Sequence, residues 1–309
     1  MKKINTISSL ILAVILCMAT LVVFTKNTIK PNVYAKVDSD TTVVGVSLPS
    51  QETEHMNKLN NSLLSCFISF NYEVIICDAQ NDAYNQKIQI ENLISQSVDA
   101  IVVMPVDEDS LITVLNSAYT EGIIIIVIGS TNNSYPPATY VDFDYSEAAY
   151  KDATDFLDNH WVEGKESSIL VVHCDNSHGT IYFKTIRDTI NERANKEEPT
   201  ISINEIRISN VNEVNSKIRD FIRTNDNHLP DAIFVCCGDT TQEVKLALHN
   251  AGFVFGPDGI PLYGFKNCSH NYDNMAKRIA QLIQSKLNGE SVPENTVILI
   301  EICNSHNDS

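Results

Sequence analysis

Apolar residues along this chain change between two spacings. Between Ile90 and Val98 they recur at intervals of three and four, which is typical of a helix that packs one face on a sheet. Residues 101–104 and 123–128 are continuous apolar runs, which indicate strands covered by helices on both faces. This order of helix, strand, helix and strand over residues 88–128 predicts a parallel α/β sheet.

The second half of the chain repeats the pattern, and 309 residues suffice for two lobes that each bury a core. Strands are expected at 43–48, 72–77, 101–104, 123–128 and 139–143, and again at 168–173, 201–208, 232–237, 261–265 and 296–303. Helices are expected after most of them, at 85–97, 110–120, 145–161, 179–196, 213–223 and 240–251, and an apolar stripe from 275 to 287 predicts a last helix. We therefore predict an α/β fold of two Rossmann-like lobes with parallel sheets, joined by a hinge.

Four segments resemble a known family: VVGVSLPSQ at 43–51, CDAQND at 77–82, QIENLISQSVDAIVVMPVD at 89–107 and GIIIIVIG at 122–129. They are similar to the first lobe of the type I periplasmic sugar-binding proteins of the ribose, galactose and xylose class. That class shares its fold with the effector domains of lac-type repressors. The resemblance implies a periplasmic binding protein-like I fold in which the chain crosses to the second lobe at 139–143.

The expected domain boundaries follow from this crossing. The N-terminal lobe is expected over 42–142, with a helix at about 270–292 returning to it. The C-terminal lobe is expected over 143–267, with a final strand at about 295–303.

The charge of the chain disfavours nucleic acid as a partner. Lys and Arg number 22 against 39 Asp and Glu, so the formal net charge is -17, which repels phosphate backbones and anionic membrane surfaces. No basic helix-turn-helix segment precedes the α/β region, which independently disfavours a lac-type repressor.

Residues 1–35 are expected to be an export signal or a signal anchor. Lys2 and Lys3 precede an uncharged run at 7–24, and residues 33–35 offer a small-residue cleavage site. The run is also about long enough to span a bilayer, so cleavage and retention both stay open. Lipidation at Cys17 is disfavoured because Leu16 stands where a small residue is required. Cleaved or retained, this segment places the rest of the chain outside the cytoplasmic membrane.

Ligands of open parallel sheets bind beyond the carboxyl ends of the strands. The resemblance places ligand contacts in the loop after the first strand, in the loop after the third strand, near the crossing and in three loops of the second lobe. The residues at these positions are Ser50, Gln51, Asp107, Asp144, Asn176, Asp239 and Asn267.

The sequence also departs from the family at this site. Gly129-Ser130 stands where the family has an Asp-Arg pair that holds sugar hydroxyls, and Gly238 replaces the Asn before Asp239. After Asn267, roughly 20 residues of the family pattern are missing, more than loop variation usually removes. We therefore expect an atypical pocket that holds ordinary pentoses weakly.

A soft-metal or thiol site is the alternative of a different class. His173-Cys174, Cys237 and Cys268-Ser269-His270 all follow strands of the second lobe, but no closed CxxC spacing accompanies them. We expect no metal and no cofactor, with these cysteines as small residues at strand ends.

The expected function is that of an extracytoplasmic, monomeric solute-binding protein, not an enzyme. Asp175, His178 and Thr180 are catalytic residue types, but no nucleophile elbow or glycine-rich phosphate loop accompanies them. By resemblance, the ligand is a sugar or sugar-like molecule that the lobes enclose by hinge motion. The partner is either an ABC permease, for uptake, or a membrane histidine kinase, for sensing.

Overall fold

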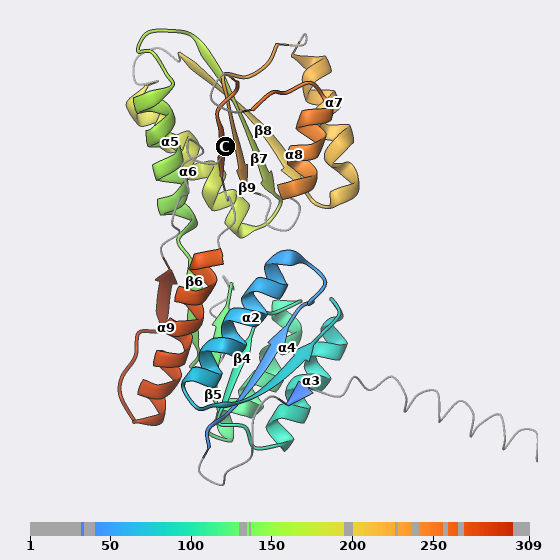
Figure 1. The fold of residues 1–309 in the computed structure, drawn as a ribbon, viewed down its shortest axis with the longest axis vertical. Coiled ribbons are helices and arrows are strands. Elements are labelled where there is room, and N and C mark those ends of the chain that lie inside the picture. The colour runs from blue at the N-terminus through green and yellow to red at the C-terminus, as the bar shows by residue number, and fades with distance from the viewer. Residues whose placement is uncertain are drawn as a thin grey trace, which may run out of the picture.

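The computed structural model describes residues 32–33, 41–129, 135, 137–194, 200–225, 228–236, 241–255, 259–264 and 269–298. Figure 1 shows two lobes stacked end to end, each a sheet flanked by helices. The predicted fold class, two parallel α/β lobes, is thereby confirmed.

The first lobe contains a seven-stranded sheet in the order β1-β3-β2-β4-β5-β6-β11. All neighbouring strands run parallel except β1 and β3, which are antiparallel. The strands are β1 Asn32–Val33, β2 Val43–Leu48, β3 Glu73–Asp78, β4 Ala100–Val103, β5 Ile124–Ile128, β6 Thr139–Phe143 and β11 Asn295–Ile298.

Helices cover both faces of this sheet. They are α2 Glu54–Ser69, α3 Ala83–Ser95, α4 Glu108–Thr120 and α9 Ser269–Leu287. Leu63 of α2 and Ile279 of α9 belong to one buried cluster, whereas Leu93 of α3 and Leu111 of α4 belong to the cluster on the other face. A Cβ atom on Gly45 would lie 2.7 Å from the Leu93 side chain, so β2 can pack this closely under α3 only because residue 45 is glycine.

The second lobe contains a four-stranded parallel sheet in the order β10-β9-β7-β8. Its strands are β7 Ser167–Cys174, β8 Ile201–Ile208, β9 Ala232–Cys236 and β10 Leu262–Gly264. Its helices are α5 Tyr145–Asn159, α6 Ser177–Arg193, η1 Val211–Glu213, α7 Val214–Thr224 and α8 Thr241–Asn250. Phe156 of α5 and Tyr182 of α6 share one core cluster, and Ile218 of α7 and Leu248 of α8 share the other.

The final strand is a correction to the sequence-based prediction. We expected 295–303 in the second lobe, but Asn295–Ile298 pair in parallel with Tyr140–Phe143 in the first sheet. The reason is that α9 packs on the first lobe, so the chain after α9 meets the free edge of β6 first. Residues 299–303 lie outside the described residues.

Other boundaries shift by a few residues. The last helix extends from Ser269 to Leu287, close to the start expected at about 270, and the short strand β1 lies at the end of the expected export signal or anchor. No helix in the described parts of the chain is long and apolar enough to span a bilayer. The run at 7–24 lies outside those parts, so the export signal or anchor stays a prediction.

Candidate ligand site at the strand ends

Three of the predicted ligand residues are helix N-caps. Oδ2 of Asp107 accepts a hydrogen bond from the backbone N–H of Ser110 at 3.0 Å, at the start of α4. Oδ1 of Asp144 accepts a hydrogen bond from the backbone N–H of Glu147 at 2.8 Å. Oδ1 of Asn176 accepts one from the backbone N–H of Gly179, in the first turn of α6, also at 2.8 Å. Each cap occupies one atom of its side chain and leaves a second polar atom for other contacts. Ligand contact by these residues stays a prediction.

The strand β2 is tied to the loop after β4 by Gln86, a residue that the sequence reading missed. Its side chain is fully buried, donates to the Ser47 hydroxyl at 3.3 Å and the Met104 carbonyl at 2.8 Å, and accepts from Val106 N at 2.7 Å. Gln86 lies four residues before Ile90, on the apolar stripe of α3. A polar residue on that stripe is the signal that identifies it.

Ser50 and Gln51 follow the strand β2. Ser50 is 3 % exposed, and its hydroxyl accepts from the backbone N–H of Glu52 at 3.1 Å, so it stabilises its own loop. Gln51 is half-buried. The predicted contacts Asp239 and Asn267 lie outside the described residues.

Only part of the alternative thiol or metal site falls within the described residues. Among the described residues, no group of three His, Cys, Asp or Glu side chains is arranged to hold a metal ion. Cys174 and Cys236 lie at the ends of neighbouring strands β7 and β9. Cys237 and Cys268 are outside the described residues, as are the side chains of Ser269 and His270.

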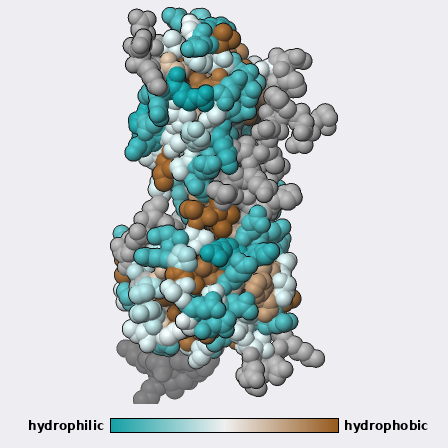
Figure 2. Space-filling view, turned by 90° about the vertical axis from the view of Figure 1, so that its left-hand side faces the viewer, coloured by the Kyte–Doolittle hydropathy of each residue, from teal (hydrophilic) through white to brown (hydrophobic). Residues whose placement is uncertain are grey.

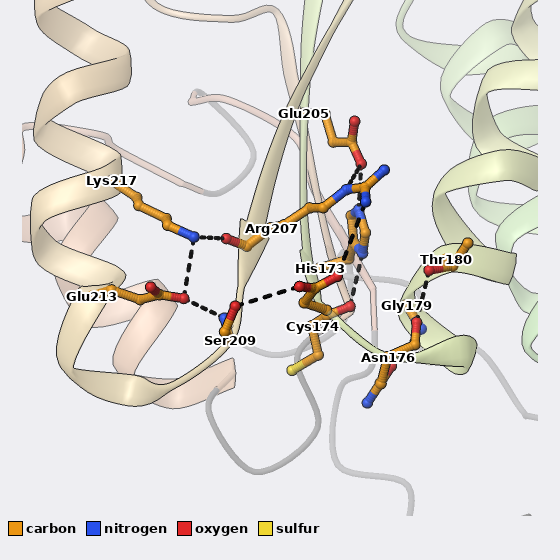
Figure 3. Close-up of polar contacts among 11 residues, drawn as sticks. His173, Cys174, Asn176, Gly179, Thr180, Glu205, Arg207, Ser209, Glu213 and Lys217 are labelled. Atoms are coloured by element: carbon orange, nitrogen blue, oxygen red, sulfur yellow. Dashed lines mark hydrogen bonds and ion pairs between the residues drawn. The ribbon is translucent and has the colours of Figure 1, made fainter.

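A polar network fixes the end of β7 in the second lobe (Figure 3). His173 is fully buried; its Nδ1 lies 2.9 Å from the Cys174 carbonyl oxygen, and its Nε2 lies 2.9 Å from Oε1 of Glu205. Arg207 donates to the same Glu205 oxygen at 2.6 Å. Burial opposes ionisation of Glu205, but the hydrogen bonds from His173 and Arg207 outweigh it and lower its pKa.

Gly179 completes this arrangement. A Cβ atom there would lie 2.1 Å from the Cys174 carbonyl oxygen and 2.8 Å from Nδ1 of His173. Only glycine lets the first turn of α6 approach β7 this closely. The polar network around buried His173 and the close approach at Gly179 together set the position of Asn176 and His178, which lie between them.

His178 extends from α6 of the second lobe to the first sheet. Its Nε2 lies 2.8 Å from Oδ2 of Asp142 on β6, and the two side chains are 18 % and 23 % exposed. Oδ1 of Asp142 accepts from the backbone N–H of Phe143 at 2.7 Å. The ring of Tyr145 stacks on His178, with centroids 4.3 Å apart and planes at 14°. This pair joins residues 36 positions apart, and no local sequence pattern signals it.

Aromatic side chains continue from this pair toward α9. Phe143 meets Tyr145 edge-on at 6.4 Å and Tyr272 of α9 edge-on at 5.6 Å. The Tyr272 hydroxyl lies 3.2 Å from Nδ1 of His55, at the start of α2. Figure 2 shows a hydrophobic patch of surface where the two lobes meet. An aromatic face beside a carboxylate and an imidazole is a combination that suits a sugar ring.

Residues 44–290 match the family model of the periplasmic binding protein domain. The chain belongs to this family. The predicted resemblance to type I periplasmic sugar-binding proteins is confirmed by this match and by the relatives below.

Two relatives of this periplasmic binding protein are similar over short segments. The ribose import binding protein of Bacillus subtilis is 41% identical over 56 residues, 18% of each chain. The D-xylose-binding periplasmic protein of Haemophilus influenzae is 28% identical over 101 residues, 33% of this chain and 30% of the relative. The matched segments thus span less than a third of these relatives, which are binding proteins.

Solved structures show the same fold over most of the chain. An ABC transporter solute binding protein from Bacillus halodurans, with bound myo-inositol, aligns with a TM-score of 0.66 at 20% sequence identity. The alignment covers 87% of this chain and 96% of that one. The family implies a location outside the cytoplasmic membrane.

Proposed function

We propose that the protein is an extracytoplasmic, monomeric solute-binding protein that captures a small polar ligand between its lobes. The ligand is a sugar or sugar-like molecule, and the protein delivers it unchanged to an ABC permease. Membership of the periplasmic binding protein family and the ligands named for its relatives support this proposal.

One observation supports the location of the site. His178 of the second lobe pairs with Asp142 of the first sheet, beside the stacked ring of Tyr145. Polar groups and an aromatic face from both lobes therefore lie together at strand ends, where ligands of parallel sheets bind.

Ligand screening tests the proposal. Neutral pentoses, hexoses and cyclic polyols are added to the purified protein, and the melting temperature is recorded, because a ligand that binds only the folded state raises it. Each positive compound is then titrated by calorimetry. The proposal is wrong if no compound of this panel binds.

A conservative variant separates ligand contact from helix capping at Asn176. Asn176→Asp keeps an oxygen for the cap of α6 but loses the Nδ2 donor, so we expect about tenfold weaker binding with little change in stability. Asn210→Asp is the matched control, because Asn210 caps η1 beyond the edge strand β8. Equal affinity of both variants and the wild type would remove Asn176 from the site.

Sensing is the second candidate function. It is favoured by the apolar run at 7–24, which has lysines on both sides and would anchor the protein beside a membrane histidine kinase. Mass spectrometry of the mature protein distinguishes sensing from uptake, because it shows whether the N-terminal segment is retained or cleaved. Retention of residues 1–35 favours sensing, and cleavage after residue 35 favours uptake.

A further inference from the structure

The described end of β5 carries only apolar residues and glycine, as the strand ends at Ile128 and Gly129 follows it. Gly129 follows the strand with a φ of +68°, in the left-handed region that side chains rarely adopt. A Cβ atom there would lie 3.5 Å from Cε of Met104 and 3.8 Å from Cε1 of His178. Both distances are ordinary van der Waals contacts, so the backbone conformation disfavours a side chain here, and His178 of the other lobe lies next to this point.

Asp142, on the neighbouring strand β6, forms a polar pair with His178 of α6. The Gly129 N–H donates to the Val141 carbonyl at 3.1 Å, so the end of β5 is fixed directly beside Asp142. Asp142 accepts from both His178 and the Phe143 backbone, and these contacts fix the orientation of its carboxylate. Both side chains of the pair keep about a fifth of their surface exposed, at 23 % and 18 %.

We propose that Asp142 and His178 contact the ligand directly and determine its specificity, in place of a charged group at the end of β5. This inference rests on the proposed function and deepens it. The carboxylate accepts ligand hydroxyls, the imidazole adds a polar contact from the second lobe, and Tyr145 and Phe143 contact an apolar ring face.

The charges indicate a neutral ligand. Within the described ranges, no Lys or Arg forms an ion pair with Asp107, Asp142 or Asp144, and the carboxylate partner of His178 is Asp142. Carboxylates without a Lys or Arg partner in the described ranges repel an anionic ligand, and the net charge of -17 adds to this repulsion. The site is therefore suited to a neutral cyclic polyol or sugar, and not to a sugar acid or sugar phosphate.

Calorimetric titration of the full-length protein tests this proposal. The probes are myo-inositol, D-ribose, D-xylose and xylitol, with D-glucuronate as the anionic counterpart. Asp142→Asn keeps the side-chain volume, His178→Gln keeps an N–H donor, and His178→Phe keeps the stack on Tyr145. Asp158→Asn and His228→Gln are the matched controls, because both residues are exposed in the second lobe.

We expect Asp142→Asn and His178→Gln each to weaken the tightest neutral probe at least tenfold, with the controls unchanged. The double variant should bind the probe more tightly than the product of the two single fold-losses in affinity predicts, because the two residues share one contact. If His178→Gln does not fold, His178→Phe must give the same loss.

Two results would overturn the inference alone. In the first, both single variants bind like the wild type while Asn176→Asp is weakened, so that the pair is purely structural and the proposed function stands. In the second, D-glucuronate binds as tightly as the neutral probes, so that the assigned ligand class is wrong. A wild type that binds none of the neutral probes overturns the proposed function itself.

Discussion

Asp152 makes the stability of the second lobe dependent on pH. Its side chain is 3 % exposed and accepts a hydrogen bond from the hydroxyl of Tyr182, which is fully buried. Burial raises the pKa of Asp152 from its ordinary 3.8 to about 7, the hydrogen bond from Tyr182 opposes this rise, and the charge of Asp155 adds to it.

The direction of the effect follows from the raised pKa. The unfolded chain releases the proton of Asp152 near pH 3.8, whereas the folded chain keeps it up to about pH 7. The contribution of protonated Asp152 to the free energy of unfolding is therefore fully present below pH 3.8 and is lost as the pH rises through about 7. At about 1.4 kcal/mol per pH unit, this interval corresponds to at most about 4 kcal/mol of the free energy of unfolding.

Asp152→Asn removes the titrating group, so its free energy of unfolding should fall less than that of the wild type between about pH 5 and about pH 8. Urea unfolding is followed by the fluorescence of Trp161, the single tryptophan, which packs on the core cluster that contains Tyr182. Asp220→Asn, at an exposed carboxylate of α7, is the control and should keep the wild-type slope. Parallel pH profiles for Asp152→Asn and the wild type would refute the reasoning.

Three further changes test the scaffold of the site. Gly179→Ala should lower the free energy of unfolding by roughly 2–4 kcal/mol in urea titrations, because its Cβ would overlap the Cys174 carbonyl oxygen; an unchanged midpoint would contradict the close approach. Gln86→Leu should lower the melting temperature through a loss of about 2 kcal/mol, because Val106 N loses its acceptor; a rise would show that burial of the amide was unfavourable. Protein without residues 1–39 should elute from gel filtration as a soluble monomer; aggregation or a stable dimer would contradict this expectation.

The repeating elements of both lobes were predictable because each strand and helix carries its own periodicity. β4 and β5 are continuous apolar runs buried between two helical layers, and the sequence alone indicates that burial. The sheet to which β11 belongs was not predictable in this way. Its pairing with β6 joins segments about 155 residues apart and depends on where α9 packs, which no local pattern encodes.

The candidate site was predictable only in part. Asp107 and Asn176 were chosen because they follow strands, but an Asp or Asn before a helix is also the sequence signature of an N-cap, and both residues cap helices. Resemblance to a family indicates which position matters, but it does not distinguish ligand contact from helix capping. The contact between Asp142 and His178 had no sequence signal, because it exists only when the lobes are folded beside each other.

The position of this contact relates binding to lobe geometry. Asp142 lies on β6, which leads through Phe143 and Asp144 directly into α5 of the second lobe. His178 is held by the second lobe alone, so the distance between the two side chains depends on the angle between the lobes. A ligand that contacts both side chains interacts best with lobe arrangements that keep them close, and it shifts the population toward these by its difference in affinity. A ligand that contacts only the first lobe has no such difference and would leave the lobe arrangement unchanged. Contacts with Asp142 and His178 would therefore determine which ligand binds, and the same contacts would let that ligand bring the two lobes together.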